Sequence, residues 1–246
     1  MYPDSDVKTS GYDRIATMFS PKGRLYQVEY ASKIVEQGTL GVGIIYNKGV
    51  LLAADKNIVS SLVIAPSIEK LFKVDEHIGA VSSGLVGDAR RLVKIARQKC
   101  QENRMLYDEK IQVEALVKEI ASVNQLFTQY AGMRPFGISL IVGGVYNGKS
   151  QLFETEPAGA LAEYTAVAIG QGKKKAMEML EKEYKVGTTL EKAIKLALKI
   201  INATSYEKKQ FDVNNVCFAY IEEGKPFEII SSDKLQALLW KNTQKD

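Results

Sequence analysis

Residues 11–38 read GYDRIATMFSPKGRLYQVEYASKIVEQG and combine a turn with a helical pattern. Pro21 disfavours the α-helical conformation at Ser20, and Gly23 adds a second break, so this part predicts a turn. After the turn, apolar residues recur at steps of three and four, as on one face of a helix: Leu25, Val28, Ala31, Ile34 and Val35. Gly38 stands where a glycine commonly ends a helix. We therefore predict an amphipathic helix before the first strand, and its apolar face must cover another surface.

Beyond residue 38, β-rich runs joined by short turns alternate with pairs of helical patterns. The expected strands are residues 39–46, 50–54, 70–74, 78–82, 137–146, 151–155, 162–169, 216–221 and 227–230. The expected helices are residues 86–100, 113–130, 173–184 and 189–205, with a short final helix from residue 232. Strands joined by short turns are antiparallel, and runs that are apolar on consecutive residues indicate coverage of both faces. The pattern therefore predicts an α+β fold, a four-layer αββα sandwich of two antiparallel sheets flanked by helix pairs.

Composition excludes several classes of protein. The chain has 246 residues, 25% of them charged and 46% hydrophobic, which are ordinary values for a globular protein. The net charge of +4 comes from 33 basic and 29 acidic residues spread along the chain, so we expect no nucleic-acid partner. Apolar runs are too short to span a membrane, and no secretion signal is recognisable. Cys100 and Cys217 are isolated, so we expect reduced core residues, no metal and no cofactor.

Two glycine-containing segments match nucleotide-binding patterns only by their letters. Residues 143–150 fit G-x-x-x-x-G-K-S, but a phosphate-binding loop must open a helix, whereas residues 151–155 are β-rich. Asn147 and Gly148 form a favoured hairpin turn instead. Gly170 and Gly172 lack the third glycine of a dinucleotide fingerprint. The lysine-rich helical runs near residues 173–199 are interpreted as solvated faces.

Five motifs together resemble one known family. Beside residues 11–38, these are SIEKLF at 67–72, SGLVGDAR at 83–90, YAGMRPFG at 130–137 and ETEPAG at 154–159. The chain resembles α-type subunits of the 20S proteasome from about residue 11 to 230, and archaeal-type chains are favoured. The resemblance implies the Ntn-hydrolase-like sandwich with an extra N-terminal helix. It also implies a non-catalytic subunit of a threonine-type endopeptidase complex that forms a heptameric outer ring and gates access to catalytic β subunits.

The resemblance assigns roles to particular residues. Four match positions that hold the N-terminal gating tail: Tyr12, Asp13, Pro21 and Tyr30. Four match the pocket that receives activator C-terminal tails: Lys70, Leu25, Gly38 and Gly84. Glu29 matches an inter-subunit helix, and three residues match pore-facing positions: Tyr130, Gly132 and Met133. The simpler alternative for Tyr12, Asp13, Pro21 and Tyr30 is ordinary turn packing, and for Lys70 it is a surface lysine at a strand start.

The implied partners follow from the same resemblance. They are other α subunits, β subunits, activators such as a proteasome-activating ATPase, and unfolded substrates in ATP-dependent or ubiquitin-type degradation. Residues 1–10 are expected as a flexible gating tail and residues 11–246 as a single domain. We expect a cytoplasmic protein, also nuclear if eukaryotic. Rings of identical subunits are favoured because the tail is short and no long acidic C-terminal extension follows.

A catalytic alternative rests on Thr39. In β-type subunits a threonine freed by cleavage after a glycine is the nucleophile, assisted by an Asp and a Lys. Gly38, Thr39, Asp55 and Lys70 stand at nearly the required spacing. The nucleophile must be a chain terminus, so residues 11–38 would have to be a discarded propeptide. Their well-formed turn and helix argue against this alternative.

Overall fold

The structure is a computed structural model that describes residues 15, 17–58, 62–204, 215–231 and 234–235. The expected gating tail, Tyr12 and Asp13 lie outside the described residues, as does most of the short helix expected from residue 232. Within the described ranges, no helix is both long and apolar enough to cross a membrane.

Two five-stranded antiparallel sheets form the centre of the molecule. The first sheet has the order β10-β9-β2-β1-β8, with the bounds β1 Gly41–Tyr46, β2 Gly49–Asp55, β8 Ala166–Ile169, β9 Val216–Glu222 and β10 Glu228–Ile230. The second sheet has the order β3-β4-β5-β6-β7, with the bounds β3 Leu71–Asp75, β4 Ile78–Gly84, β5 Ile138–Tyr146, β6 Lys149–Thr155 and β7 Leu161–Glu163. Every pairing is antiparallel, as the short turns predict.

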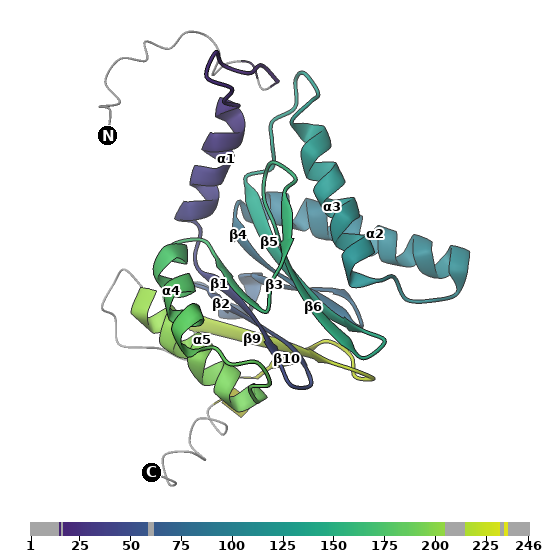
Figure 1. Cartoon of the computed structure of the whole chain (residues 1–246), viewed down its shortest axis with the longest axis vertical. Helices are drawn as coiled ribbons and strands as arrows, with labels where there is room; N and C mark the ends of the chain where they lie inside the picture. Colours follow the sequence, from purple (N-terminus) through teal and green to yellow (C-terminus); the bar gives the residue numbers. More distant parts are fainter. Residues whose placement is uncertain (1–14, 16, 59–61, 205–214, 232–233, 236–246) are drawn as a thin grey trace.

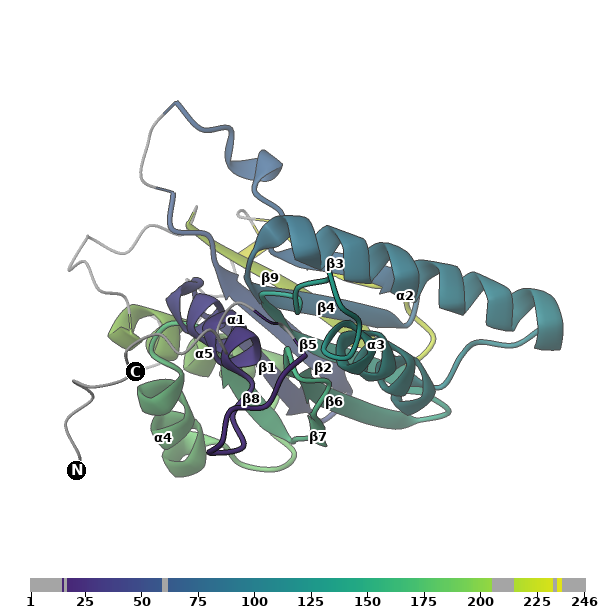
Figure 2. The same cartoon turned by 90° about the horizontal axis from the view of Figure 1, so that it is seen from above.

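A helix pair covers the outer face of each sheet (Figures 1 and 2). Helices α2 (Val86–Tyr107) and α3 (Val113–Phe127) pack on the second sheet, and α4 (Lys173–Glu183) and α5 (Leu190–Thr204) pack on the first. Burial explains the consecutive apolar residues of the strands. On β2, Leu51 faces the α4–α5 layer and Leu52 faces the opposite sheet, and both are fully buried. The predicted four-layer αββα sandwich is confirmed.

Helix α1 (Tyr26–Gln37) lies at one end of the sandwich, where it contacts β4 and β5 (Figure 1). It buries Ala31 and Val35, two residues of the predicted apolar face. The extra N-terminal helix is therefore confirmed, and it covers part of the second sheet at β4 and β5.

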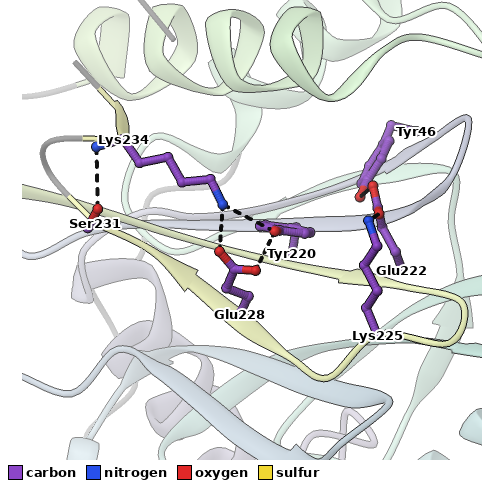
Figure 3. A network of polar contacts seen from close by, with 7 residues as sticks. All are labelled: Tyr46, Tyr220, Glu222, Lys225, Glu228, Ser231 and Lys234. Carbon is purple, nitrogen blue, oxygen red and sulfur yellow. Dashed lines mark hydrogen bonds and ion pairs between the residues drawn. The ribbon is translucent and has the colours of Figure 1, made fainter. Parts of the chain in front are cut away.

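Polar side chains of β1, β9 and β10 contact one another within the first sheet, and Lys234 joins them from the segment after β10 (Figure 3). Tyr46 of β1 donates a hydrogen bond of 2.9 Å to Glu222 at the end of β9. Further along the hairpin, the Glu228 carboxylate accepts hydrogen bonds of 2.5 Å from Tyr220 and from Lys234. The first contact joins β1 to β9 across β2, and the other two join β10 to β9 and to the segment after β10.

Three local predictions were wrong. Residues 162–169 do not form one strand, because β7 belongs to the second sheet and β8 to the first. Thr188 and Glu191 have the spacing of a capping box, which predicts Thr188 as the cap of α5, but Thr189 lies directly before the first residue of α5 and its hydroxyl accepts the Lys192 N–H at 3.4 Å. The second predicted helix ends at Phe127 rather than Tyr130. The hairpin interpretation of Asn147 and Gly148 is confirmed, with φ of 50° and 75°.

Candidate functional site

The segment before α1 forms the predicted turn. Its Ser20 is buried, and the Ser20 carbonyl accepts the Gly23 N–H at 2.8 Å. Pro21 occupies the second turn position, where its fixed φ fits, and Gly23 has a φ of 73°. The Ser20 hydroxyl accepts the Arg24 N–H at 3.0 Å. Pro21 itself is exposed. The buried Ser20 therefore holds the turn through its hydrogen bonds, while Pro21 faces solvent.

Two other expected site residues lie on the outward face of α1. The Glu29 carboxylate accepts hydrogen bonds from the Arg24 guanidinium, which lowers the pKa of Glu29 below its ordinary value. Within this chain, the Glu29 carboxylate is therefore paired with Arg24. Tyr30 is 41% exposed, and Lys33 lies over its ring at 6.0 Å. Leu25 is half-buried directly before the first residue of the helix.

The C-terminal end of α1 is fixed between the two sheets. Gly38 donates its N–H to Val35 at 3.0 Å, and its carbonyl accepts the Gln171 N–H at 2.7 Å. The Ser83 hydroxyl oxygen lies 3.1 Å from the carbonyl oxygens of both Val35 and Thr39. Residues from α1, β4 and the segment after β8 therefore meet at one seam, called here the α1 seam: Val35, Gly38, Thr39, Ser83 and Gln171.

Gly38 is required for a different reason from the one predicted. Its φ of −67° is an ordinary value, so no left-handed helix cap is present. A Cβ at Gly38 would instead lie 2.3 Å from the Gly84 nitrogen and 2.4 Å from the Ser83 hydroxyl oxygen. Gly84 has a φ of 116°, which favours glycine. Gly38 and Gly84, both expected in the activator pocket, are therefore in direct contact.

Lys70 is buried beside the same end of β4, so the interpretation as a surface lysine is wrong. Lys70 is 7% exposed, and its backbone carbonyl accepts the Ser82 N–H at 3.1 Å. Burial lowers the pKa of the Lys70 ammonium, while Cys217 and Asp55 act in the opposite direction. Burial likewise raises the pKa of Asp55 against the effects of Asn57 and Lys70. No carboxylate of the described residues lies within 4.0 Å of the Lys70 nitrogen, although Asp55 is near enough for their charges to interact.

Leu25 is separated from the other residues expected in the pocket. Helix α1 has 12 residues and lies between Leu25 and Gly38. At a rise of 1.5 Å per residue, the two positions are about 20 Å apart along the helix. One protomer therefore brings together Lys70, Gly38 and Gly84, while Leu25 lies with Pro21 at the other end of α1.

Thr39 lies inside the chain and not at the first strand residue, since β1 begins at Gly41. Its side-chain oxygen is buried without a hydrogen-bond partner among the described residues. The nitrogen of Thr39 is a peptide amide that follows Gly38 in the α1 seam. Asp55 does end β2 and Lys70 does precede β3, so the spatial elements of the catalytic alternative are present without a free amine.

Sequence reasoning missed an ion pair at the segment expected to face a pore. Arg134 donates two hydrogen bonds, of 2.7 and 2.8 Å, to the Asp88 carboxylate in the first turn of α2. The Gly137 N–H also donates to Asp88 at 2.9 Å. Burial raises the pKa of Asp88, but these hydrogen bonds and the Arg134 charge outweigh it, so the pKa is lowered. Asp88 and Arg134 both lie in quoted motifs, and that is the only signal the sequence offers for the pair.

The other expected pore-facing residues lie just before this ion pair. Tyr130 and Met133 are exposed, and Gly132 has a φ of 82° in an exposed turn.

His77, the one histidine of the chain, is buried, with its Nε2 at 2.8 Å from the Ile111 carbonyl oxygen. Within the described ranges, no three His, Cys, Asp or Glu residues are grouped so that they could hold a metal ion.

Comparisons with known proteins agree with this geometry. The family model described as "Proteasome subunit" matches residues 35–221, and the model of the N-terminal signature of A-type proteasome subunits matches residues 12–33. The chain is similar to three archaeal proteins that are named as proteasome alpha subunits. The protein of Methanobrevibacter smithii is 49% identical over 95% of this chain and 93% of its own length. That of Methanoregula boonei is 52% identical over 87% and 88%. That of Methanocaldococcus jannaschii is 44% identical over 96% and 89%. The chain therefore belongs to the family of proteasome alpha subunits.

Proposed function

We propose that this chain is a non-catalytic α-ring subunit of a 20S proteasome core particle in the cytoplasm. Seven copies form an outer ring against β subunits, which carry out the proteolysis. The ring controls the entry of unfolded substrates, and activators such as a proteasome-activating ATPase dock on it. Family membership supports this function, and the α1 seam is the observation that carries the non-catalytic role.

The α1 seam supports the absence of catalysis for a physical reason. A threonine nucleophile of this type needs its own α-amine as the base. The Gly38 N–H and carbonyl are both hydrogen-bonded within the fold, and α1 buries Ala31 and Val35 against it. Intact mass of the chain in the assembled particle tests this role. A chain that retains residues 1–38 is expected, and a chain that begins at Thr39 would establish the peptidase instead.

The proposed activator site uses the buried ammonium of Lys70. A tail carboxylate is a suitable partner because Lys70 has no carboxylate within 4.0 Å among the described residues. Gly38 and Gly84 lie close together near the same end of β4 as Lys70. Because α1 separates Leu25 from this group, the proposed pocket is completed between neighbours in the ring, with Leu25 presented by one protomer and Lys70 by the next.

Substitution of Lys70 tests the pocket. In particles that contain Lys70→Met, we expect an activator with a free tail carboxylate to lose at least about 90% of its stimulation of peptide hydrolysis, because one charge-assisted contact is worth about 1.5–3 kcal/mol. Basal hydrolysis and ring assembly stay near wild type. The control is Lys73→Met, which removes an exposed ammonium from the adjacent strand. Full stimulation of Lys70→Met particles would contradict the pocket assignment.

The proposed gate is the tail of residues 1–10, positioned by Tyr12, Asp13, Pro21 and Tyr30. The hydrogen bonds made by the buried Ser20 support a fixed base for such a tail. Deletion of residues 1–10 is expected to raise basal hydrolysis of a short peptide by the assembled particle, because an obstruction is removed. Unchanged basal hydrolysis would show that the tail does not obstruct entry.

A further inference from the structure

A groove beside the turn between α4 and α5 has no role in the proposed gate or activator pocket. It has a volume of about 440 Å³ and is lined by residues of the turn and of α5. Tyr184 lines the groove and is held against the first sheet, because its hydroxyl donates a hydrogen bond of 3.0 Å to the Ile45 carbonyl of β1. Helices α4 and α5 form the outer layer on the first sheet, on the opposite side of the two sheets from α2 and α3 (Figure 1).

Lysines dominate the charged lining of this groove. Lys192, Lys195 and Lys199 recur at three and four residues on one face of α5, and Lys185 stands on the turn. Lys199 has an acidic partner, Glu183, at 2.6 Å. Lys185, Lys192 and Lys195 have no carboxylate within 4.0 Å among the described residues. Three lysines thus line one groove without a contacting carboxylate among the described residues, and Glu183, which pairs with Lys199, is the one acidic residue in the described lining.

This arrangement costs stability unless an anion neutralises it. Like charges three or four residues apart on a helix repel one another. The spacing of Lys192, Lys195 and Lys199 corresponds to about 4.5 and 6 Å along the helix axis. Carboxylates on alternate residues of an extended peptide repeat at about 6.6 Å, and those on one face of a helical peptide repeat at about 6 Å. An acidic peptide can therefore place carboxylates against successive lysines.

Apolar groups in the same groove favour a peptide over a phosphate polymer. Val186 on the turn is 86% exposed, and the half-buried Leu196 lies between the lysines of α5. A partner that offers only phosphates would leave these apolar surfaces in water, whereas a peptide can cover them with an apolar side chain. We propose that the groove binds an acidic segment of another protein that carries apolar residues between its carboxylates, as a docking surface separate from the Lys70 pocket.

Binding of a synthetic peptide to the assembled particle tests this proposal. The probe is a fluorescein-labelled peptide with the repeat Glu-Leu-Glu, measured by fluorescence anisotropy. We expect Lys192→Gln combined with Lys195→Gln to weaken binding by about fivefold, because each lost exposed ion pair contributes modestly. The matched control, Lys174→Gln combined with Lys182→Gln, removes two exposed lysines of α4 outside the groove and is expected to leave binding unchanged. Gln is a good helix former, so both double variants retain their helices.

The remaining outcomes also decide the proposal. A peptide with Ser in place of Leu is expected to bind more weakly, and inorganic polyphosphate is expected to compete poorly. Absence of binding to the wild-type particle would overturn the docking surface. Equal loss in both double variants would show attraction to net charge alone and would overturn it as well. Strong competition by polyphosphate, together with no effect of the Leu-to-Ser change, would replace the peptide site with a general polyanion site.

Discussion

The ion pair between Asp88 and Arg134 makes a prediction that separates two kinds of contact. Asp88→Ala removes the carboxylate that accepts two hydrogen bonds from Arg134 and one from the buried Gly137 N–H. Arg134→Ala removes only the first two and leaves the Gly137 hydrogen bond in place. The two substitutions therefore differ by the cost of a buried N–H without a partner and by the loss of a negative charge in the first turn of α2.

The magnitudes follow from the exposure of each group. The Arg134 side chain is 59% exposed, so its ion pair contributes about 0.2–1 kcal/mol. An unsatisfied Gly137 N–H costs about 1–3 kcal/mol. The lost charge in the first turn of α2 adds about 0.3–1 kcal/mol. Asp88→Ala is therefore expected to reduce the free energy of unfolding by about 2–4 kcal/mol, and Arg134→Ala by less than about 1 kcal/mol.

Thermal unfolding at fixed protein concentration measures both effects. For a chain of this length, each kcal/mol lowers Tm by about 2–4 °C, so Asp88→Ala is expected to lose about 5–15 °C. The control is Glu69→Ala, which removes an exposed carboxylate paired with Arg90 at 3.0 Å. Its Tm is expected to change by no more than Arg134→Ala changes it. Equal Tm losses for Asp88→Ala and Arg134→Ala would refute the reasoning, because the Gly137 hydrogen bond would then contribute nothing.

The pH dependence of this difference has a definite sign. The pKa of Asp88 is lowered in the folded state, despite burial, by the hydrogen bonds from Arg134 and Gly137. A lowered carboxyl pKa contributes stability that is present above the unfolded value of about 3.9 and is lost as the pH falls through the folded-state value. The stability gap between wild type and Asp88→Ala is therefore expected to stay constant from about pH 8 to 5 and to narrow below about pH 4.

Two further predictions concern backbone space and a buried charge. Gly84→Ala is expected to lower the free energy of unfolding by at least about 2 kcal/mol, since its Cβ would lie 2.2 Å from the Gly137 carbonyl oxygen at a φ of 116°. The control, Gly87→Ala, has open space in α2, so its free energy of unfolding is expected to stay unchanged or to rise by up to about 1 kcal/mol. Urea unfolding measures both. Lys173→Met leaves the buried Glu154 carboxylate, 2.5 Å from the Lys173 nitrogen, without its cation. Burial raises the pKa of Glu154 against the effect of Lys173, so the loss of Tm is expected to be larger at pH 8 than at pH 5. An equal loss at both pH values would contradict a role for the Glu154 charge.

Local sequence patterns were sufficient for most elements of the fold. The turn at Pro21 and Gly23 and the helix after it depend on neighbouring residues only, and so does the Asn147–Gly148 hairpin. Residues 162–169 could not be divided correctly, because a short apolar run does not state which sheet each half joins. The Tyr164 N–H pairs with Leu152 of the second sheet, while Thr165 accepts the Ile45 N–H of the first. Only the packing of the two sheets determines that crossing.

The site could be predicted by position more readily than by environment. Gly38 was placed correctly at the end of α1, but its close contact with Gly84 joins segments 46 residues apart and leaves no local pattern. Lys70 was expected in the activator pocket, with a surface lysine as the alternative because lysines are usually exposed, and no local pattern indicated its burial between strands of both sheets. The Asp88–Arg134 pair likewise joins two motifs through space.

The α1 seam has a mechanical consequence for the whole chain. The connection at Gly38 and Thr39 is hydrogen-bonded to α1, to β4 of the second sheet and to the segment after β8 of the first sheet. A displacement of α1 is therefore transmitted to both sheets. Removal of residues 1–38 would also expose to water the part of β4 and β5 that α1 covers. Conversion of such a chain into a peptidase would thus first require new residues on β4 and β5 that are stable in contact with water, and only then a change of side-chain chemistry.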